Sequence, residues 1–184
     1  AIGAPSNSGN GVYSGHVRVY EYSSGSWTQV GADIDGNTAA DYNYSGRSVS
    51  ISSDGSRVAI GANNNDGNGS NSGHVRIYEY SSGSWNQLGA DIDGEAAYDR
   101  SGSSVSLSSD GSRVAIGAYG NDGAQYSNKI DSGHVRIYEY SSGSWNQLGA
   151  DIDGEALNDN SGYSVSLSSD GSRVAIGASG NDGN

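Results

Sequence analysis

One pattern constrains this sequence more than any other: a unit of about 60 residues recurs along it almost unchanged. The segment Ser-Gly-His-Val-Arg begins at Ser14, Ser72 and Ser132, so its copies lie 58 and 60 residues apart. The segment Ala-Ile-Gly-Ala recurs in step with it, beginning at Ala1, Ala59, Ala115 and Ala175. Such a period is typical of stacked repeats, in which each unit buries its apolar face only against its neighbours.

Two stretches of the unit vary in length, and these predict its loops. Eight residues separate Gly36 from Ser45, whereas six stand at the same place in the later copies. The stretch 63–71 has nine residues, and its counterpart 119–131 has thirteen. Loops tolerate insertions and packed strands do not, so the constant stretches predict the scaffold.

Alternation of apolar and polar residues predicts four short strands in each unit and excludes helices. In the second unit these are Ser-Val-Ser-Ile, Arg-Val-Ala-Ile-Gly-Ala, His-Val-Arg-Ile-Tyr-Glu-Tyr and Trp-Asn-Gln-Leu-Gly-Ala-Asp-Ile. Asp54-Gly55 separates the first two strands, and Asp-Gly between alternating segments predicts a tight hairpin turn. The fourth strand is expected to be continuous, with Val30, Ala32 and Ile34 of the first unit on one face.

The expected fold class is therefore all-β: tandem four-stranded antiparallel sheets of about 60 residues each, stacked on one another. Strands two to four of a partial unit occupy residues 1–44, complete units occupy 45–100 and 101–160, and strands one and two of another unit occupy 161–184. Because the chain lacks Met and begins inside a unit, we expect it to belong to a longer protein or a repeating assembly.

Charge and composition narrow the range of partners. The net charge is −12 and Lys129 is the sole lysine, so binding to a nucleic-acid backbone or an anionic membrane surface is disfavoured. The chain has no Cys, and no apolar run approaches the roughly 20 residues that span a bilayer. The expected partners are further repeats of its own kind, or a glycan or protein ligand. An acidic, lysine-poor surface suits an extracellular or cell-surface protein.

Three motifs in a fixed order resemble the FG-GAP repeat of integrin-α-type β-propellers. Ser45-Gly46 opens a first strand, Gly3-Ala4-Pro5 closes a second strand, and a Gly-x-Val-x-x-Tyr strand follows. The resemblance covers essentially the whole chain and implies β-propeller-like blades, as part of a propeller or of a repeating assembly. Ser replaces the family's Phe. The family's calcium loop, Asp-x-Asp-x-Asp-Gly between the first two strands, is reduced to Ser-Asp-Gly-Ser, so that calcium site is not expected here.

Other carboxylates suggest a different calcium site. Asp-Ile-Asp-Gly ends each fourth strand, and alternate carboxylates on an extended segment point the same way. A further acid follows each copy in the next loop, and in the first unit that acid is Asp41. An oxygen cage for calcium and a solvated strand end with a capped turn both fit this pattern. The candidate ligands are Asp33, Asp35, Asp91, Asp93, Asp99, Asp151, Asp153 and Asp159.

The three histidines, His16, His74 and His134, occupy the same position in successive units. Residues in separate blades lie too far apart to share one metal ion, so a packing or hydrogen-bonding role is expected. Every His is a repeat copy and no phosphate-binding glycine loop precedes a helix, so no catalytic site is expected. Sequons at Asn43 and Asn68 fall in predicted loops and predict N-glycosylation there.

These features favour a non-enzymatic extracellular protein with a structural or adhesive role, because near-identical repeats present the same surface many times. We expect it to self-associate or to continue into flanking repeats, and so to form part of a larger or filamentous assembly. The alternative is a ligand-binding propeller that holds a glycan or a protein at loops on one rim. Calcium is the one cofactor that the sequence suggests.

Overall fold

The computed structural model is all-β and describes residues 1–37, 42–122 and 131–183. Within these residues the named strands pair only in antiparallel fashion, as the alternation in the sequence predicts. This described part of the chain contains no helix with the length and apolar character that a membrane crossing requires.

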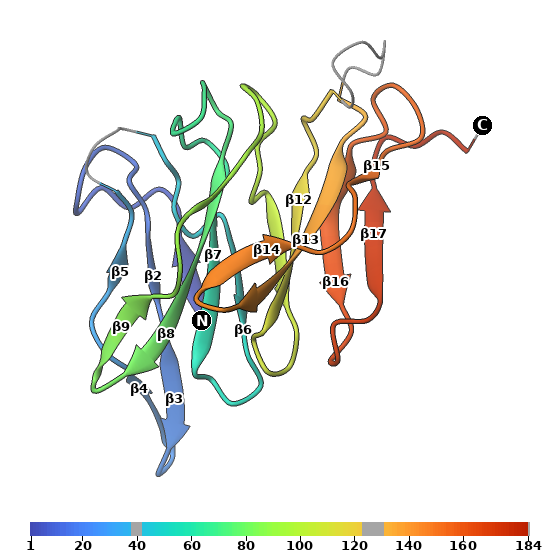
Figure 1. Ribbon diagram of the computed structural model, residues 1–184. Coiled ribbons are helices and arrows are strands. Elements are labelled where there is room, and N and C mark those ends of the chain that lie inside the picture. The colour runs from blue at the N-terminus through green and yellow to red at the C-terminus, as the bar shows by residue number, and fades with distance from the viewer. Residues whose placement is uncertain (38–41, 123–130, 184) are drawn as a thin grey trace.

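The strands fall into four groups that follow the repeats (Figure 1). The first group has β1 Ile2–Ala4, β2 His16–Arg18, β3 Tyr20–Ser23, β4 Ser26–Gln29 and β5 Ile34–Asp35. The second has β6 Ser48–Ile51, β7 Arg57–Ala62, β8 His74–Ser81, β9 Ser84–Gln87 and β10 Ile92–Asp93. The third has β11 Ser104–Leu107, β12 Arg113–Ala118, β13 His134–Ser141, β14 Ser144–Gln147 and β15 Ile152–Asp153. The last has β16 Ser161–Leu167 and β17 Val174–Ala178.

The second and third groups share one strand order. In the second, β6 pairs with β7 and β7 with β8, and both β9 and β10 pair with the outer edge of β8. The first group forms a sheet of β1, β2 and β5 with a separate β3–β4 hairpin, and the last is the β16–β17 pair. Each sheet is therefore built from consecutive segments of the chain, joined by loops at its ends.

The prediction of a continuous fourth strand is wrong, because that segment is broken into β9 and β10. Tyr78 lies opposite Gln87, whereas Val75 lies opposite Ile92, so five steps along one segment match three steps along β8. The two extra residues fall at Gly89, whose φ of +78° favours glycine. In the first repeat the same break leaves Ala32 exposed and Ile34 buried, so these two do not share one buried face.

The hairpin predicted at Asp54-Gly55 is present between β6 and β7. Its backbone closes with Ser52 and Arg57 as the last paired residues, so the loop holds four residues rather than two. The Asp54 carboxylate fills the loop, accepting hydrogen bonds from the Ser52 hydroxyl at 2.6 Å and from the backbone N–H of Ser56 at 2.9 Å. These bonds from Ser52 and Ser56 lower the pKa of Asp54 to about 2.

Successive sheets pack face to face and bury two layers of apolar side chains. Val58 and Ile60 of β7 face the first sheet, where they meet Val17 and Ile34. The opposite face of the second sheet packs against the third sheet. The residues buried between these two sheets are Ala59, Val75, Ile77, Ile92, Val105, Leu107, Val114, Ile116 and Tyr138. Burial of these layers is the main source of stability, and no single sheet could supply it alone.

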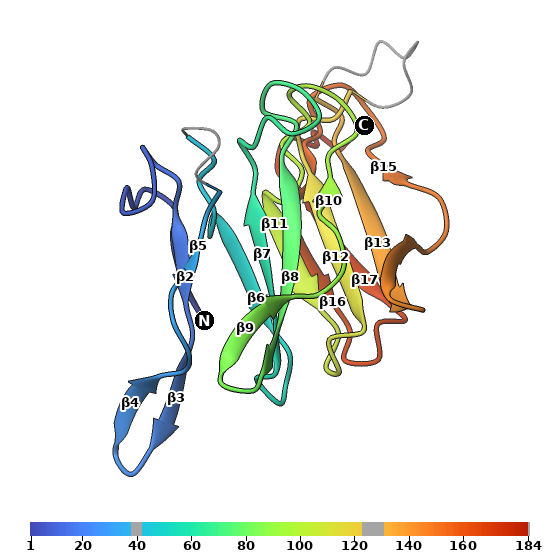
Figure 2. The same ribbon diagram turned by 60° about the vertical axis from the view of Figure 1, so that its left-hand side comes forward.

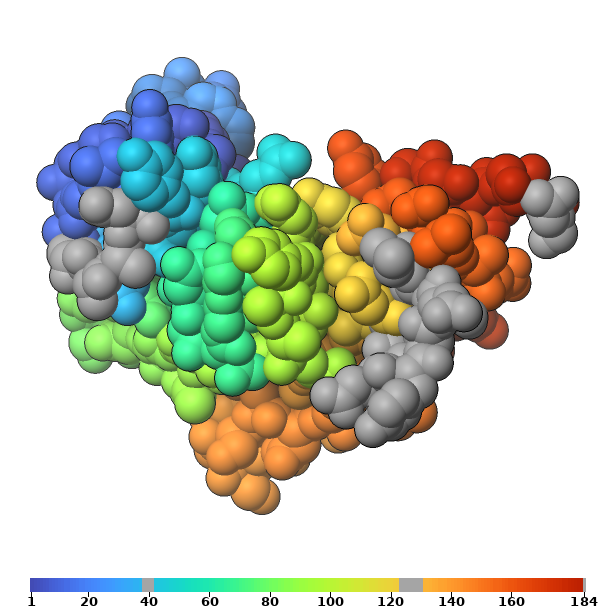
Figure 3. Space-filling model, turned by 90° about the horizontal axis from the view of Figure 1, so that it is seen from above, coloured from blue at the N-terminus to red at the C-terminus, as the bar shows by residue number. Residues whose placement is uncertain are grey.

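The strands β6, β11 and β16 lie next to one another, so the sheets converge along this side. The sheets follow one another in chain order from the N-terminal to the C-terminal residues, as Figure 2 shows from the side and Figure 3 from above. Small residues permit the convergence: a Cβ on Gly61 would overlap the carbonyl oxygen of Gly102 in the next repeat. The Ser48 hydroxyl donates to that same carbonyl at 2.7 Å.

Candidate functional site

The first Asp of each Asp-Ile-Asp segment meets an arginine from the neighbouring strand in the first two repeats. His74 of β8 lies opposite Asp93, so Arg76, two residues later, comes level with Asp91. Arg76 holds Asp91 with two parallel hydrogen bonds, Nε to Oδ1 at 2.9 Å and Nη2 to Oδ2 at 2.7 Å. Arg18 donates the same two hydrogen bonds to Asp33, from Nε at 2.9 Å and from Nη2 at 2.7 Å. Such bidentate pairs are the strongest geometry available to these groups.

The arginines keep these carboxylates ionised. Hydrogen bonds from Arg18 and Gln29 lower the pKa of Asp33 to about 2. Burial opposes ionisation of Asp91, but hydrogen bonds from Arg76 and Gln87 outweigh it and lower the pKa of that carboxyl.

Each histidine lies beside the same carboxylate, within its own repeat. Nδ1 of His74 is 3.7 Å from Asp91 Oδ2, and Nδ1 of His16 is 3.8 Å from Asp33 Oδ2. His74 is buried, and burial lowers its pKa to about 4, with the charge of Arg76 acting in the same direction. The imidazole is therefore neutral at neutral pH and serves as packing beside the Arg–Asp pair.

The third repeat builds a different arrangement from the same residues. Arg136 contacts the preceding repeat instead of Asp151. It donates to the backbone carbonyl of Asp93 at 2.8 Å, and its Nη1 lies 3.4 Å from Oε1 of Glu95. His134 then faces two carboxylates, Glu95 at 3.9 Å and Asp151 at 3.8 Å. Glu95 belongs to the repeat before His134, and the equivalent residue in the repeat before His74 is Asn37. Because asparagine carries no carboxylate, the sequence accounts for this difference.

The other candidate calcium ligands lie at strand ends and in turns. Asp35, Asp93 and Asp153 are exposed at the ends of β5, β10 and β15. Buried Asp99 and Asp159 cap turns instead: Asp99 accepts from the backbone N–H of Ala96, and Asp159 from that of Ala156. Asp41 lies outside the described residues.

The described residues contain two groups that could supply metal ligands. Within each group the ligand atoms lie within 4.8 Å of one another. One group is His74, Asp91 and Asp93, and the other is Glu95, His134 and Asp151. Calcium takes six to eight oxygen ligands and excludes a neighbouring guanidinium by repulsion. Each set includes a neutral imidazole and adjoins Arg76 or Arg136. The hairpin at Asp54, where the FG-GAP pattern would place calcium, offers one carboxylate that serines already occupy. These residues fit Arg–carboxylate pairing and not a calcium cage.

The two sequons differ in exposure. Asn43 is 1% exposed and donates from its side chain to the carbonyl of Asn37, so an attached glycan does not fit the folded chain. Asn68 is exposed, and its amide nitrogen donates to the carbonyl of Gly94 at 2.8 Å. Glycosylation at Asn68 remains a prediction.

We call the edge at which β2, β8 and β13 begin the loop edge, and it lies at the top of Figure 1. Tyrosines that the sequence did not single out gather there. Tyr13 stacks on Tyr44 with ring centroids 5.6 Å apart and contacts Tyr42 at 5.4 Å. Backbone bonds from Tyr42 to Val12 and from Tyr44 to Tyr13 hold the two loops together. Tyr13, Tyr42 and Tyr44 have positive φ values of 48°, 67° and 55°, so the backbone is held in a conformation that such residues rarely adopt.

Positions equivalent to these tyrosines carry different residues in the later repeats. Tyr42 corresponds to Tyr98 and Asn158, and Tyr44 corresponds to Arg100 and Asn160. All of these positions also have positive φ. The loop edge thus presents differing side chains from one repeated backbone. The signal was in the sequence, because these positions change while the strands around them stay constant.

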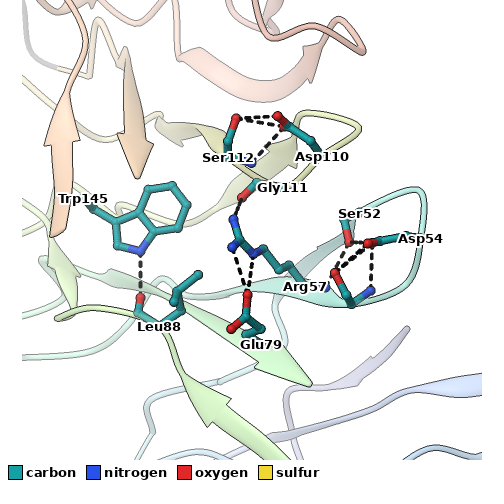
Figure 4. Close-up of polar contacts among 10 residues, drawn as sticks. Ser52, Asp54, Arg57, Glu79, Leu88, Asp110, Gly111, Ser112 and Trp145 are labelled. Atoms are coloured by element: carbon teal, nitrogen blue, oxygen red, sulfur yellow. Dashed lines mark hydrogen bonds and ion pairs between the residues drawn. The ribbon is translucent and has the colours of Figure 1, made fainter. Parts of the chain in front are cut away.

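A second feature that the motifs did not reveal is the contact that the tryptophans of the second and third repeats make with the preceding repeat. The indole N–H of Trp85 donates to the carbonyl of Val30 at 2.8 Å, and that of Trp145 donates to Leu88 at 2.7 Å (Figure 4). Arg57 makes the reverse connection, donating to Glu79 in its own sheet and to the carbonyl of Gly111 in the next.

Two equivalent hollows lie beside these tryptophans. One, of about 390 Å³, lies between Asp33, Asp35 and the ring side chains of Tyr78 and Trp85. Its counterpart, of about 230 Å³, lies between Asp91, Asp93, Tyr138 and Trp145. Each combines acceptor oxygens with aromatic faces, which suits a ligand rich in hydroxyl groups.

Comparison with known proteins agrees with the fold. The family model of the FG-GAP repeat matches residues 27–78. No curated protein matches the chain. Among solved structures, a candidate 6-phosphogluconolactonase from Bacteroides uniformis is similar with a TM-score of 0.52 and 11% identity, over 88% of this chain and 40% of that one. The chain thus spans less than half of that protein, and the likeness concerns the fold alone. The chain carries a repeat of the FG-GAP type.

Proposed function

We propose that this chain is a non-enzymatic structural or adhesive repeat protein of the β-propeller type, working outside the cell or on its surface within a larger or filamentous assembly. The observation that supports the proposal is the repetition of one set of contacts between successive sheets. Trp85 and Trp145 bind back to the preceding repeat, and Arg57 and Arg113 bind forward to the next. A module that stacks in this manner can be extended without changing its contacts.

The FG-GAP repeat and the convergence of β6, β11 and β16 on one side support propeller blades of four strands. In such blades the loops at one end form a common rim. Here that rim carries the exposed residues that differ between repeats, while the sheets beneath it are nearly identical. This division between a constant scaffold and a variable surface is typical of proteins that hold partners through loops.

Location and adhesion can be tested together in the source cells. Antibodies against the chain should label intact, unpermeabilised cells, and surface protease should remove the label. Beads coated with the purified chain should bind those cells more than beads coated with albumin do. Label that appears only after permeabilisation, together with beads that do not bind, would contradict the proposal.

A second candidate is the binding of one glycan or protein ligand at the loop edge. It is favoured by the Tyr13, Tyr42 and Tyr44 cluster, because fixed tyrosines offer broad contact at low entropic cost. A glycan array and a pull-down should then give one saturable ligand whose affinity falls in Tyr42→Ser. Tyr22→Ser is the matched control, since Tyr22 is also exposed but lies in the hairpin at the opposite edge. Equal losses in both variants would exclude this site.

Calcium dependence of either function is tested by the melting temperature. Because Arg18 and Arg76 hold the carboxylates of Asp33 and Asp91, we expect the same melting temperature in chelator and in millimolar calcium. Stabilisation by calcium that is lost in Asp93→Ala would show that the Asp-Ile-Asp segment binds the ion after all.

A further inference from the structure

His134 is the most completely buried of the three histidines, and its imidazole lies beside two carboxylates. Its side chain is 2% exposed. Nδ1 lies 3.9 Å from Oε2 of Glu95 and 3.8 Å from Oδ2 of Asp151, and both distances exceed that of a hydrogen bond. Within the described residues the ring makes no hydrogen bond. A buried polar group without a hydrogen-bond partner is costly, so the three side chains are arranged for a partner that lies between them.

Each of the two carboxylates is held through its other oxygen. Oδ1 of Asp151 accepts a hydrogen bond from Nε2 of Gln147 at 2.6 Å. Oε1 of Glu95 lies 3.4 Å from Nη1 of Arg136. In the described part of the chain, the oxygens that face the imidazole, Oδ2 and Oε2, accept no hydrogen bond. Carboxylates that ligate a metal are oriented by outer hydrogen bonds in this manner.

The protonation state of the imidazole suits a metal ligand. Burial lowers the pKa of His134, and the charge of Arg136 acts in the same direction, so the ring is neutral at neutral pH. Its Nδ1 can then offer a lone pair to a cation. A neutral imidazole with two carboxylates is a donor set that zinc accepts. Together with Arg136, the two carboxylates leave one net negative charge, which favours a divalent cation.

We propose that Glu95, His134 and Asp151 bind one Zn²⁺ ion through Oε2, Nδ1 and Oδ2, with water in the fourth position. Zinc lies about 2.0–2.2 Å from such ligands, which sets tetrahedral ligand atoms roughly 3.4 Å apart. Nδ1 therefore needs to approach each carboxylate oxygen by only about 0.5 Å. The ion joins two repeats, because Glu95 follows β10 of the second sheet while His134 and Asp151 belong to the third. The site does not depend on the location or adhesion of the protein.

The preceding repeat shows what a histidine without this site looks like. His74 occupies the position of His134, but Arg76 donates to both oxygens of Asp91, at 2.9 and 2.7 Å. The residue equivalent to Glu95 is Asn37, which has no carboxylate. A metal ion beside His74 must displace the guanidinium from Asp91. We therefore expect no zinc at His74, and the chain supplies its own control.

Isothermal titration calorimetry with zinc chloride tests the site. Protein without an affinity tag is first stripped of metal with chelator and dialysed, and the calcium measurement uses the same preparation. The wild-type chain should bind one zinc ion, and zinc should raise its melting temperature. His134→Gln and Glu95→Gln should each weaken binding roughly a hundredfold or more, since loss of an outer hydrogen-bond partner alone costs about 10–100-fold. His74→Gln is the matched control and should bind zinc as the wild type does.

Two outcomes would overturn the inference. One is a wild-type chain that takes up no zinc and melts at the same temperature with and without it. The other is zinc affinity that is unchanged in Glu95→Gln, or that falls equally in His74→Gln and His134→Gln. Circular dichroism identifies a variant that fails to fold. If His134→Gln does so, Glu95→Gln still decides, because the Glu95 side chain is 45% exposed and its amide analogue has the same shape.

Discussion

At the scale of single residues, a buried histidine shares its surroundings with an arginine and a carboxylate that are already paired. Burial and Arg76 lower the pKa of His74 to about 4, while Asp91 opposes them. The unfolded chain takes up this proton near pH 6.5. Between about pH 6.5 and 4 the unfolded state therefore binds more protons, and the free energy of unfolding should fall as the pH falls. Denaturant titrations across this range measure the effect.

His74→Gln should flatten this pH dependence, because the glutamine does not titrate. Asp93 also adjoins the site, and burial raises its pKa, so its own titration acts in the opposite sense. The quantity to compare is thus the difference in slope between the variant and the wild type. Asp54→Asn is the control, since the pKa of Asp54 is about 2 and lies below the window. If His74→Gln leaves the slope unchanged, His74 takes up its proton over the same pH range in the folded and the unfolded chain.

At the scale of the elements, the β13–β14 hairpin is attached to the preceding sheet through Trp145. Trp145→Ala removes the hydrogen bond to Leu88 and the packing on Gly89, and should lower the free energy of unfolding by about 2 kcal/mol. Trp27→Ala changes the same residue in the same turn, where the side chain is 68% exposed. It should cost no more than about 0.5 kcal/mol in dilute solution. Equal costs would show that docking of the indole contributes nothing.

Strand alternation predicted most of these elements from the sequence. The first three strands of the complete repeats and the Asp54-Gly55 hairpin are where the pattern of Val, Ile and Gly placed them. The break between β9 and β10 was not predictable from alternation. The segment around Gly89 has two more residues than its partner strand, and an even number of extra residues leaves the alternation of polar and apolar residues unchanged. Periodicity describes one strand and is silent about a bulge against its partner.

The candidate site was harder to predict than the fold, for a related reason. The spacing of Asp91 and Asp93 correctly suggested that their carboxylates lie close together. The pairing of Asp91 with Arg76 depends on the register between β10 and β8, which only the folded sheet reveals. Likewise, Glu95 of the second repeat lies beside His134 of the third, and the pattern within one repeat does not predict a contact between repeats.

At the scale of the whole molecule, stability should decline from the middle sheets toward the ends, because each sheet is stabilised by its neighbours. All residues of β7 and β12 after the first are buried, whereas β3 is mostly exposed and β17 only partly covered. Hydrogen exchange should therefore be slowest in β7 and β12, intermediate in β17 and fastest in the β3–β4 hairpin. Uniform protection along the chain would mean that the sheets open as one unit.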